Sequence, residues 1–149
     1  MESVDAARER ARRKIGVADH ILTQTYPLVR DPKLLLAVLQ NIFDSVDANV
    51  EAALRSLLEK KKVLHIPELF ESRLQVLAQQ CPLEKSLLRF ARELQETMHE
   101  HKQSPVEFAR KEMFVICDSS YGVRTLRPEQ LKRYVQHARA FHTVIGEHL

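Results

Sequence analysis

Apolar residues recur at helical spacing along most of the chain. The longest series lies within residues 32–62, where successive members are three or four positions apart. This spacing places the side chains on one face of an α-helix. The pattern therefore predicts a long helix with a continuous apolar seam, formed by Leu36, Leu39, Phe43, Val46, Val50, Ala53 and Leu57.

A second seam, made mostly of small side chains, precedes the long helix. Its members lie on one face of a helix predicted over residues 4–26, and they are Val4, Ala7, Ala11, Ile15, Ala18 and Leu22. Small side chains let two helix backbones approach closely. Because only the segment PLVRD separates the two seams, we expect residues 4–26 and 32–62 to form a long antiparallel hairpin.

Prolines indicate where the remaining helices begin. Proline suits the first turn of a helix, where its missing N–H would have no partner, and five prolines stand at the start of apolar series. Pro27 is expected to end the first helix instead, because the residue before a proline avoids helical geometry. The sequence thus predicts an all-α bundle of about six helices, with four shorter helices packed on the hairpin. The predicted ranges are 4–26, 32–62, 67–80, 82–102, 105–117 and 128–148.

The segment KEMFVICDSSYGVRTLRPEQL, residues 111–131, could be taken for an active-site loop. Ser104, Pro105 and Glu107 form a capping-box pattern, and Met113 and Ile116 continue the helical spacing of Val106 and Ala109. We therefore interpret the segment as the end of one helix, a turn and the start of the next. A strand over residues 114–117 is the alternative, since periodicity cannot assign so short an apolar run, although the sequence offers no obvious partner strand.

The bulk properties fit one folded domain over residues 1–149, with a possible sub-boundary near 63–67. Apolar residues make up 44% of the 149 positions, which is ordinary for a globular protein. Net charge is only +3, from 23 basic and 20 acidic side chains, so any basic site must be local. The charged amino terminus does not resemble a secretory signal. No apolar run approaches the roughly 20 residues that cross a bilayer, and we expect a cytoplasmic location with no membrane contact.

No residue pattern identifies a metal site, a cofactor site or a nucleophile. Cys81 and Cys117 lack the spacing of paired metal ligands, and both are expected to be reduced and mostly buried. His99 and His101 lie two positions apart on a predicted helix and so point in different directions. A reactive Cys117 would need a histidine base from elsewhere in the chain. We expect neither a metal nor a cofactor.

Two local features favour an RNA-directed protein. Residues 124–139 carry a basic patch that could bind phosphate groups, formed by Arg124, Arg127, Lys132, Arg133, His137 and Arg139. A solvated helix face is the other interpretation of this patch. Separately, the Arg92-to-His99 spacing resembles that of HEPN-type ribonucleases, small helical bundles in which an Arg holds phosphate and a His aids attack by the ribose hydroxyl. Arg13 and His20 share this spacing, and about two such pairs are expected by chance.

The sequence favours a protein that acts by binding. Beyond its seam, the long helix carries Leu34, Leu35 and Leu58, which give it more apolar width than one neighbouring helix covers. That width is either core or a face for another protein or a second copy. We therefore predict a non-enzymatic protein-interaction or assembly module. The alternative is an RNA-directed protein, either an RNA binder that uses the basic patch or a metal-independent ribonuclease that uses Arg92 and His99.

Overall fold

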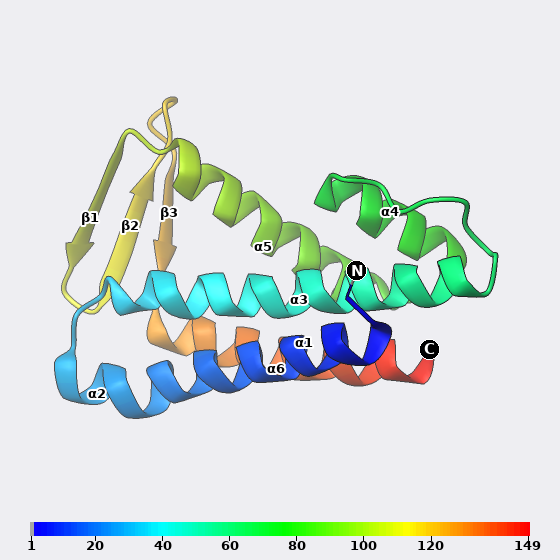
Figure 1. Cartoon of the computed structure of the whole chain (residues 1–149). Coiled ribbons are helices and arrows are strands. Elements are labelled where there is room, and N and C mark those ends of the chain that lie inside the picture. The colour runs from blue at the N-terminus through cyan, green and yellow to red at the C-terminus, as the bar shows by residue number, and fades with distance from the viewer. Residues whose placement is uncertain (1) are drawn as a thin grey trace.

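The computed structural model describes residues 2–149 as a helical bundle with a small three-stranded antiparallel sheet at one end (Figure 1). The α1 helix, the π-helical segment and α2 follow one another without a break, so we count five helices. The helical bundle was predicted correctly, whereas the all-α class and the sixth helix were wrong. The elements are α1 (Val4–His20), the π-helical segment (Ile21–Thr25), α2 (Tyr26–Val29), α3 (Leu34–Glu59), α4 (Phe70–Gln80), α5 (Lys85–Gln103), β1 (Val106–Arg110), β2 (Met113–Cys117), β3 (Val123–Leu126) and α6 (Pro128–Glu147).

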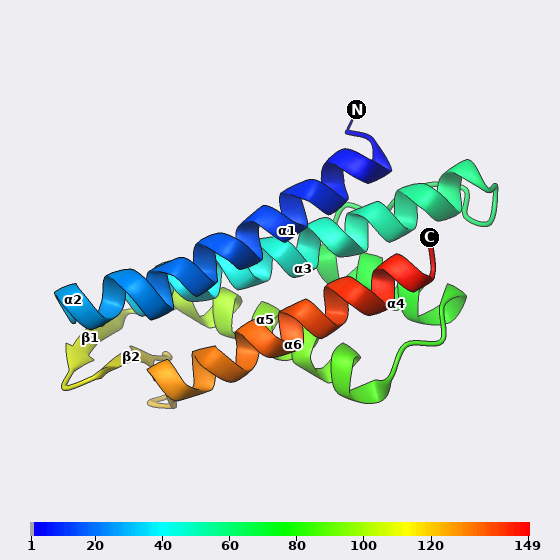
Figure 2. The same ribbon diagram turned by 90° about the horizontal axis from the view of Figure 1, so that it is seen from below.

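Helix α3 is the centre of the bundle. The α1 and α6 helices lie along one side of it, and α4 and α5 lie on the other (Figures 1 and 2). The predicted antiparallel hairpin is present, with Ala7, Ala11 and Ala18 of α1 fully buried against neighbouring helices. Because α3 is covered on several sides, Leu35 is also fully buried and Leu34 packs against the core. The extra apolar width of α3 at these positions is therefore core.

The first helix continues past Pro27, contrary to the prediction. The N–H of Tyr26 donates to the carbonyl of Ile21, five residues earlier, and the chain stays helical to Val29. Proline has no N–H to donate and its ring clashes with the preceding turn, and the wider π-helical turn accommodates both effects. The helix ends at Arg30, whose φ of 52° is left-handed.

Two other prolines, each predicted to start a helix, instead follow directly after the end of the preceding helix. Cys81 and Ser104 both have extended backbone geometry and directly precede Pro82 and Pro105. This is the conformation that a following proline imposes. As a result α4 ends at Gln80 and α5 at Gln103. Of the expected starting positions, Pro128 is the one that occupies the first turn of its helix.

The largest correction concerns residues 105–117, which form strands in place of the predicted helix. β1 and β2 pair antiparallel from Val106 opposite Cys117 to Arg110 opposite Met113, and β3 pairs with the other edge of β2. The two-residue turn between β1 and β2 contains Lys111, whose φ is 53°. Ser104 does not cap a helix, because its hydroxyl donates to the carbonyls of Val106 and Cys117, at 2.8 and 2.6 Å.

One face of the sheet, the inner face, closes the end of the helical core. Phe114 and Ile116 of β2 and Leu126 of β3 are buried in the same cluster as the helices. On the same face, Glu107 of β1 lies 2.6 Å from Nδ1 of His101, near the end of α5. The sheet is thus fixed to α5 by a polar contact at its edge and by apolar packing at its centre.

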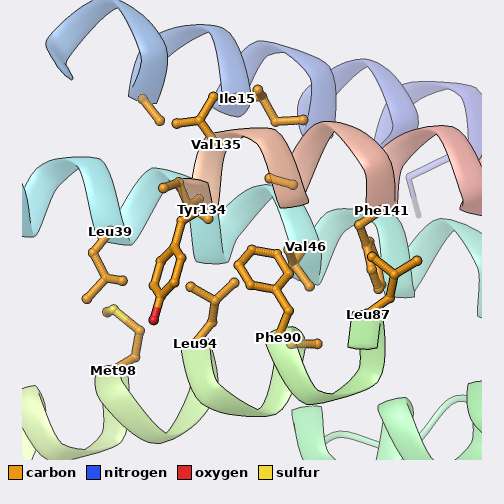
Figure 3. Packing of buried hydrophobic residues seen from close by; sticks show 14 of the residues in the cluster. Ile15, Leu39, Val46, Leu87, Phe90, Leu94, Met98, Tyr134, Val135 and Phe141 are labelled. Atoms are coloured by element: carbon orange, nitrogen blue, oxygen red, sulfur yellow. The ribbon is translucent and has the colours of Figure 1, made fainter. Parts of the chain in front are cut away.

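The interior between α3, α5 and α6 is filled by large side chains (Figure 3). Phe90, Leu94 and Met98 of α5 point toward α6 and α3, and Phe141 of α6 lies beside Leu87. The rings of Phe90 and Tyr134 meet edge to face, with centroids 5.4 Å apart. Such pairs contribute packing energy beyond the burial of apolar surface, so α5 and α6 are held together near the middle of their lengths.

A polar cluster joins α1, α3 and α6 on the other side of the bundle. Nη1 of Arg8 donates to Oδ1 of Asn49 at 2.8 Å and to the carbonyl of His142 at 2.7 Å. Nδ1 of His142 lies 3.1 Å from both Nη1 of Arg8 and Oδ1 of Asn49. Burial lowers the pKa of His142 from its ordinary 6.5, and the charges of Arg8 and Arg12 lower it further, with Glu9 opposing them.

We expect His142 to make folding stability depend on pH. Because its pKa is lower in the folded protein, the unfolded chain takes up a proton first as the pH falls below about 6.5. The contribution of His142 to the free energy of unfolding is therefore fully present above that pH. It decreases as the pH falls below that value toward the pKa of the folded state. Urea denaturation at a series of pH values measures this decrease. His142→Gln should remove it, whereas His65→Gln, at an exposed loop position, should leave it; an unchanged slope in His142→Gln would contradict the assignment.

Candidate functional site

The outer face of the sheet, opposite the helices, is mostly apolar, and its β1 and β3 side chains are exposed at several positions, while Val115 in the central strand is buried. Residues directly opposite one another in an antiparallel pair point to the same side, so Val106, Cys117 and Val123 form one row and Phe108, Val115 and Thr125 form the next. Val106, Phe108 and Val123 are 54%, 43% and 65% exposed. An antiparallel sheet with one solvated face normally carries alternating polar residues there, whereas on this face only Arg110 and Thr125 are polar and the other strand residues are apolar.

A shallow depression of about 530 Å³ lies at the end of this face, and its lining is mostly apolar. Pro105, Val106, Cys117 and Val123 contribute to it from the strands, and Asp118, Ser119 and Tyr121 from the β2–β3 loop. Cys117 is a free, half-buried thiol at the end of β2, where a helix end had been predicted. No histidine is among the residues that line the depression, so it gives the thiol no base.

The β2–β3 loop holds Tyr121 out into solvent. Oδ1 of Asp118 accepts the backbone N–H groups of Ser120 and Gly122, at 2.9 and 2.7 Å. Tyr121 has a left-handed φ of 66° and is 95% exposed. A positive φ is unfavourable for a bulky residue, and such conformations cluster at functional sites. The loop therefore holds an aromatic side chain beside the apolar face, where a partner bound to that face would also cover it.

The sequence contained a weak signal for this face. Val106 and Phe108 alternate with polar or small residues in VEFAR, and FVIC is rich in strand-forming residues. The turn between them lacks the Gly or Asn that usually marks a hairpin, and the capping-box pattern at Ser104 pointed to a helix. The outer face was therefore missing from the sequence-based site.

A second candidate site is an open groove of about 680 Å³ along α5. It brings together two residues that sequence analysis had assigned to different hypotheses, Arg92 of α5 and Arg124 of β3. Lys85 and Arg89 add positive charge, and Glu93 and Glu96 add negative charge. The lining thus carries a small excess of positive charge, as a weak phosphate-binding groove would.

An ion pair and a hydrogen bond restrain two of the charged side chains that line this groove. Nε of Arg124 donates to Glu100 at 2.7 Å, and this hydrogen bond raises the pKa of Arg124. The hydroxyl of Tyr134 donates to Glu93 at 2.6 Å across the α5–α6 contact. Burial, together with this hydrogen bond, raises the pKa of Tyr134 to about 12. Arg124 and Glu93 are therefore committed to structural contacts.

The rest of the predicted basic patch is spread over several surfaces. Arg127 lines a separate hollow with Lys111 and Glu112. Arg139 forms an ion pair with Asp19 of α1 at 3.3 Å. The ring of His137 lies 5.2 Å from that of Phe90. Lys132 and Arg133 are exposed on α6.

Arg92 and His99 have different surroundings on α5. They are seven positions apart in the helix, which separates them by about 10 Å along the axis. Arg92 lies 3.6 Å from Glu71 of α4. His99 lines a small hollow with Phe43, Phe70 and Met98, among others. The ribonuclease hypothesis therefore stays a prediction, carried only by the spacing of the two residues.

Residues 2–149 contain no group of three or more His, Cys, Asp or Glu side chains placed to hold a metal ion. None of the described helices is both long and apolar enough to span a membrane. Comparison of the chain with protein-family models, with curated proteins and with solved structures finds no match.

Proposed function

We propose that the protein is a non-enzymatic interaction module in the cytoplasm that binds a protein partner on the outer face of its sheet. The observation that carries this proposal is the group of exposed apolar side chains on the outer face, Val106, Phe108 and Val123, next to Tyr121. Contiguous exposed apolar side chains on a folded protein mark interaction sites. Tyrosine and phenylalanine are also enriched at the centres of protein interfaces.

The polar groups of the chain support binding over catalysis. The depression next to Cys117 is lined mostly by apolar side chains, with Asp118, Ser119 and Tyr121 from the loop, and the loop uses the carboxylate of Asp118 to accept backbone N–H groups. A binding face needs no activated group; it needs a fixed surface that excludes water around a few large side chains. The sheet supplies that surface, and the β2–β3 loop adds Tyr121.

Site-specific photocrosslinking in cells tests this proposal. A photoreactive phenylalanine analogue at position 108 or 121 should give covalent adducts with protein. The same analogue at position 64 is the matched control, because Leu64 is also apolar and is 95% exposed on the α3–α4 loop. Adducts that form equally well from all three positions, or from position 64 alone, would contradict the proposal.

RNA binding in the α5 groove is the second candidate function, because Arg92 and Arg124 lie there together with Lys85 and Arg89. Fluorescence anisotropy with single-stranded RNA tests it, since binding through phosphate contacts weakens steeply with salt. Arg89→Glu, in the groove, should weaken binding more than Lys132→Glu on exposed α6. Equal loss in both variants would count against the groove, and RNA cleavage that survives His99→Ala would remove the ribonuclease hypothesis.

A further inference from the structure

The outer face of the sheet carries opposite charges at its two ends. Arg110 is the last residue of β1, next to the β1–β2 turn, and lies on the same face as Val106 and Phe108. Lys111 follows in the turn. Asp118 lies at the opposite end, just after β2. Glu112 in the turn is paired with Arg30 at 2.9 Å, so the hairpin end is positive and the loop end is negative.

Within residues 2–149 the charged side chains at both ends lack an ion-pair partner, while the carboxylate of Asp118 also accepts the backbone N–H groups of Ser120 and Gly122. Neither Arg110, Lys111 nor Asp118 takes part in an ion pair within residues 2–149. Between the two ends the face is mostly apolar, with exposed Phe108, buried Val115 and Thr125 in its middle row. A surface that is apolar in the centre and oppositely charged at its ends is complementary to a copy of itself turned end for end.

We infer that the partner on this face is a second copy of the chain, packed sheet on sheet with antiparallel strands. This inference rests on the proposed function of the same face. A two-fold axis near the Phe108–Val115 row places the Arg110 end of each copy over the Asp118 end of the other. The parallel arrangement would bring like charges together. A two-fold interface uses the same patch twice and closes after two copies, and two packed sheets lie about 10 Å apart.

Sedimentation of the full chain over a range of concentrations measures this association. A reversible dimer is expected, and it should weaken as salt screens the end charges. Phe108→Glu should raise the dimer dissociation constant by about 100-fold or more, because it buries an unpaired charge at the centre of the contact. Leu64→Glu, the matched control on the α3–α4 loop, should leave the constant unchanged.

A charge exchange between two variants tests the antiparallel arrangement. Arg110→Glu and Asp118→Lys should each associate poorly alone, because each brings like charges together at both ends of its own dimer. Mixed together, they should form a heterodimer, since both end contacts are then between opposite charges. If thermal melting shows that Asp118→Lys unfolds the loop, Arg110→Glu alone decides, with an expected weakening of about tenfold. Equal association of wild type and Arg110→Glu would overturn the arrangement.

Crosslinking from position 108 separates a failure of this inference from a failure of the proposed function. A product of twice the chain mass supports both. Adducts with a different protein only, from a chain that stays monomeric at every concentration, overturn the second copy and keep the docking face. The absence of adducts above the position 64 control overturns both.

Discussion

Replacing Phe141 with alanine is expected to lower the free energy of unfolding by about 3–5 kcal/mol. Phe141 is fully buried on α6, facing the interior beside Leu87 (Figure 3). Removing its ring costs the burial of that apolar surface and leaves a cavity that helices on several sides cannot all close. Urea denaturation followed by far-ultraviolet circular dichroism measures the change.

Phe108→Ala is the matched control, since the same atoms are removed from the outer face of the sheet. Phe108 is partly exposed, so the change in stability of the monomer should be below about 1 kcal/mol. A loss at Phe108 as large as that at Phe141 would mean that the outer face is packed in the monomer, which contradicts its assignment as a docking surface.

Gly122→Ala is expected to destabilise the protein by about 1–3 kcal/mol. A Cβ at this position would overlap the carboxyl group of Asp118. That group cannot move away without losing its hydrogen bonds to the N–H groups of Ser120 and Gly122. The substitution should therefore open the loop that presents Tyr121, and crosslinking from position 121 should fall along with the stability.

Gly16→Ala, the same chemical change at a helical position, is expected to stabilise the protein instead. Gly16 is exposed within α1, and a Cβ there meets no atom within 4 Å. Alanine is the better helix former, so this variant should gain about 0.5–1 kcal/mol. Chemical denaturation of both variants side by side tests the pair. Equal effects of the two substitutions would contradict the described loop geometry.

The helical part of the fold could be predicted because its signal is long and periodic. The seam of α1 is buried almost as predicted, and α3 begins and ends within three residues of its predicted range. The helix starts were less predictable, since a proline can follow a helix as well as begin one. At Pro82 and Pro105 the extended preceding residue terminates the helix.

The sheet could not be predicted because its signals are short and conflict with one another. Met113 and Ile116 fit a helical spacing from Val106 and Ala109. In the structure, however, these residues belong to two strands, in which successive side chains point to alternating faces of the sheet. Lys111 takes the left-handed turn position that glycine or asparagine usually fills. Tertiary packing of Phe114 and Ile116 against the helices decides in favour of strands, and local sequence does not contain that information.

For the candidate site, too, individual residues could be identified from the sequence, but their arrangement in space could not. The sequence shows charged residues only one by one, and the groove along α5 brings Arg92 and Arg124 together. The contacts of Arg124 with Glu100 and of Arg139 with Asp19 depend on the tertiary fold and are not encoded locally. The docking face arises from three strands brought into register, so no contiguous motif encodes it.

The most direct test of the account is the backbone geometry of residues 104–126 in solution. Nuclear Overhauser spectroscopy should give contacts from Cys117 to Val106 and to Val123, since these residues lie opposite one another in the sheet. With those contacts, the apolar outer face exists as described. Helical contacts between residues three positions apart through 105–117, without cross-strand contacts, would contradict the sheet and the docking face that depends on it.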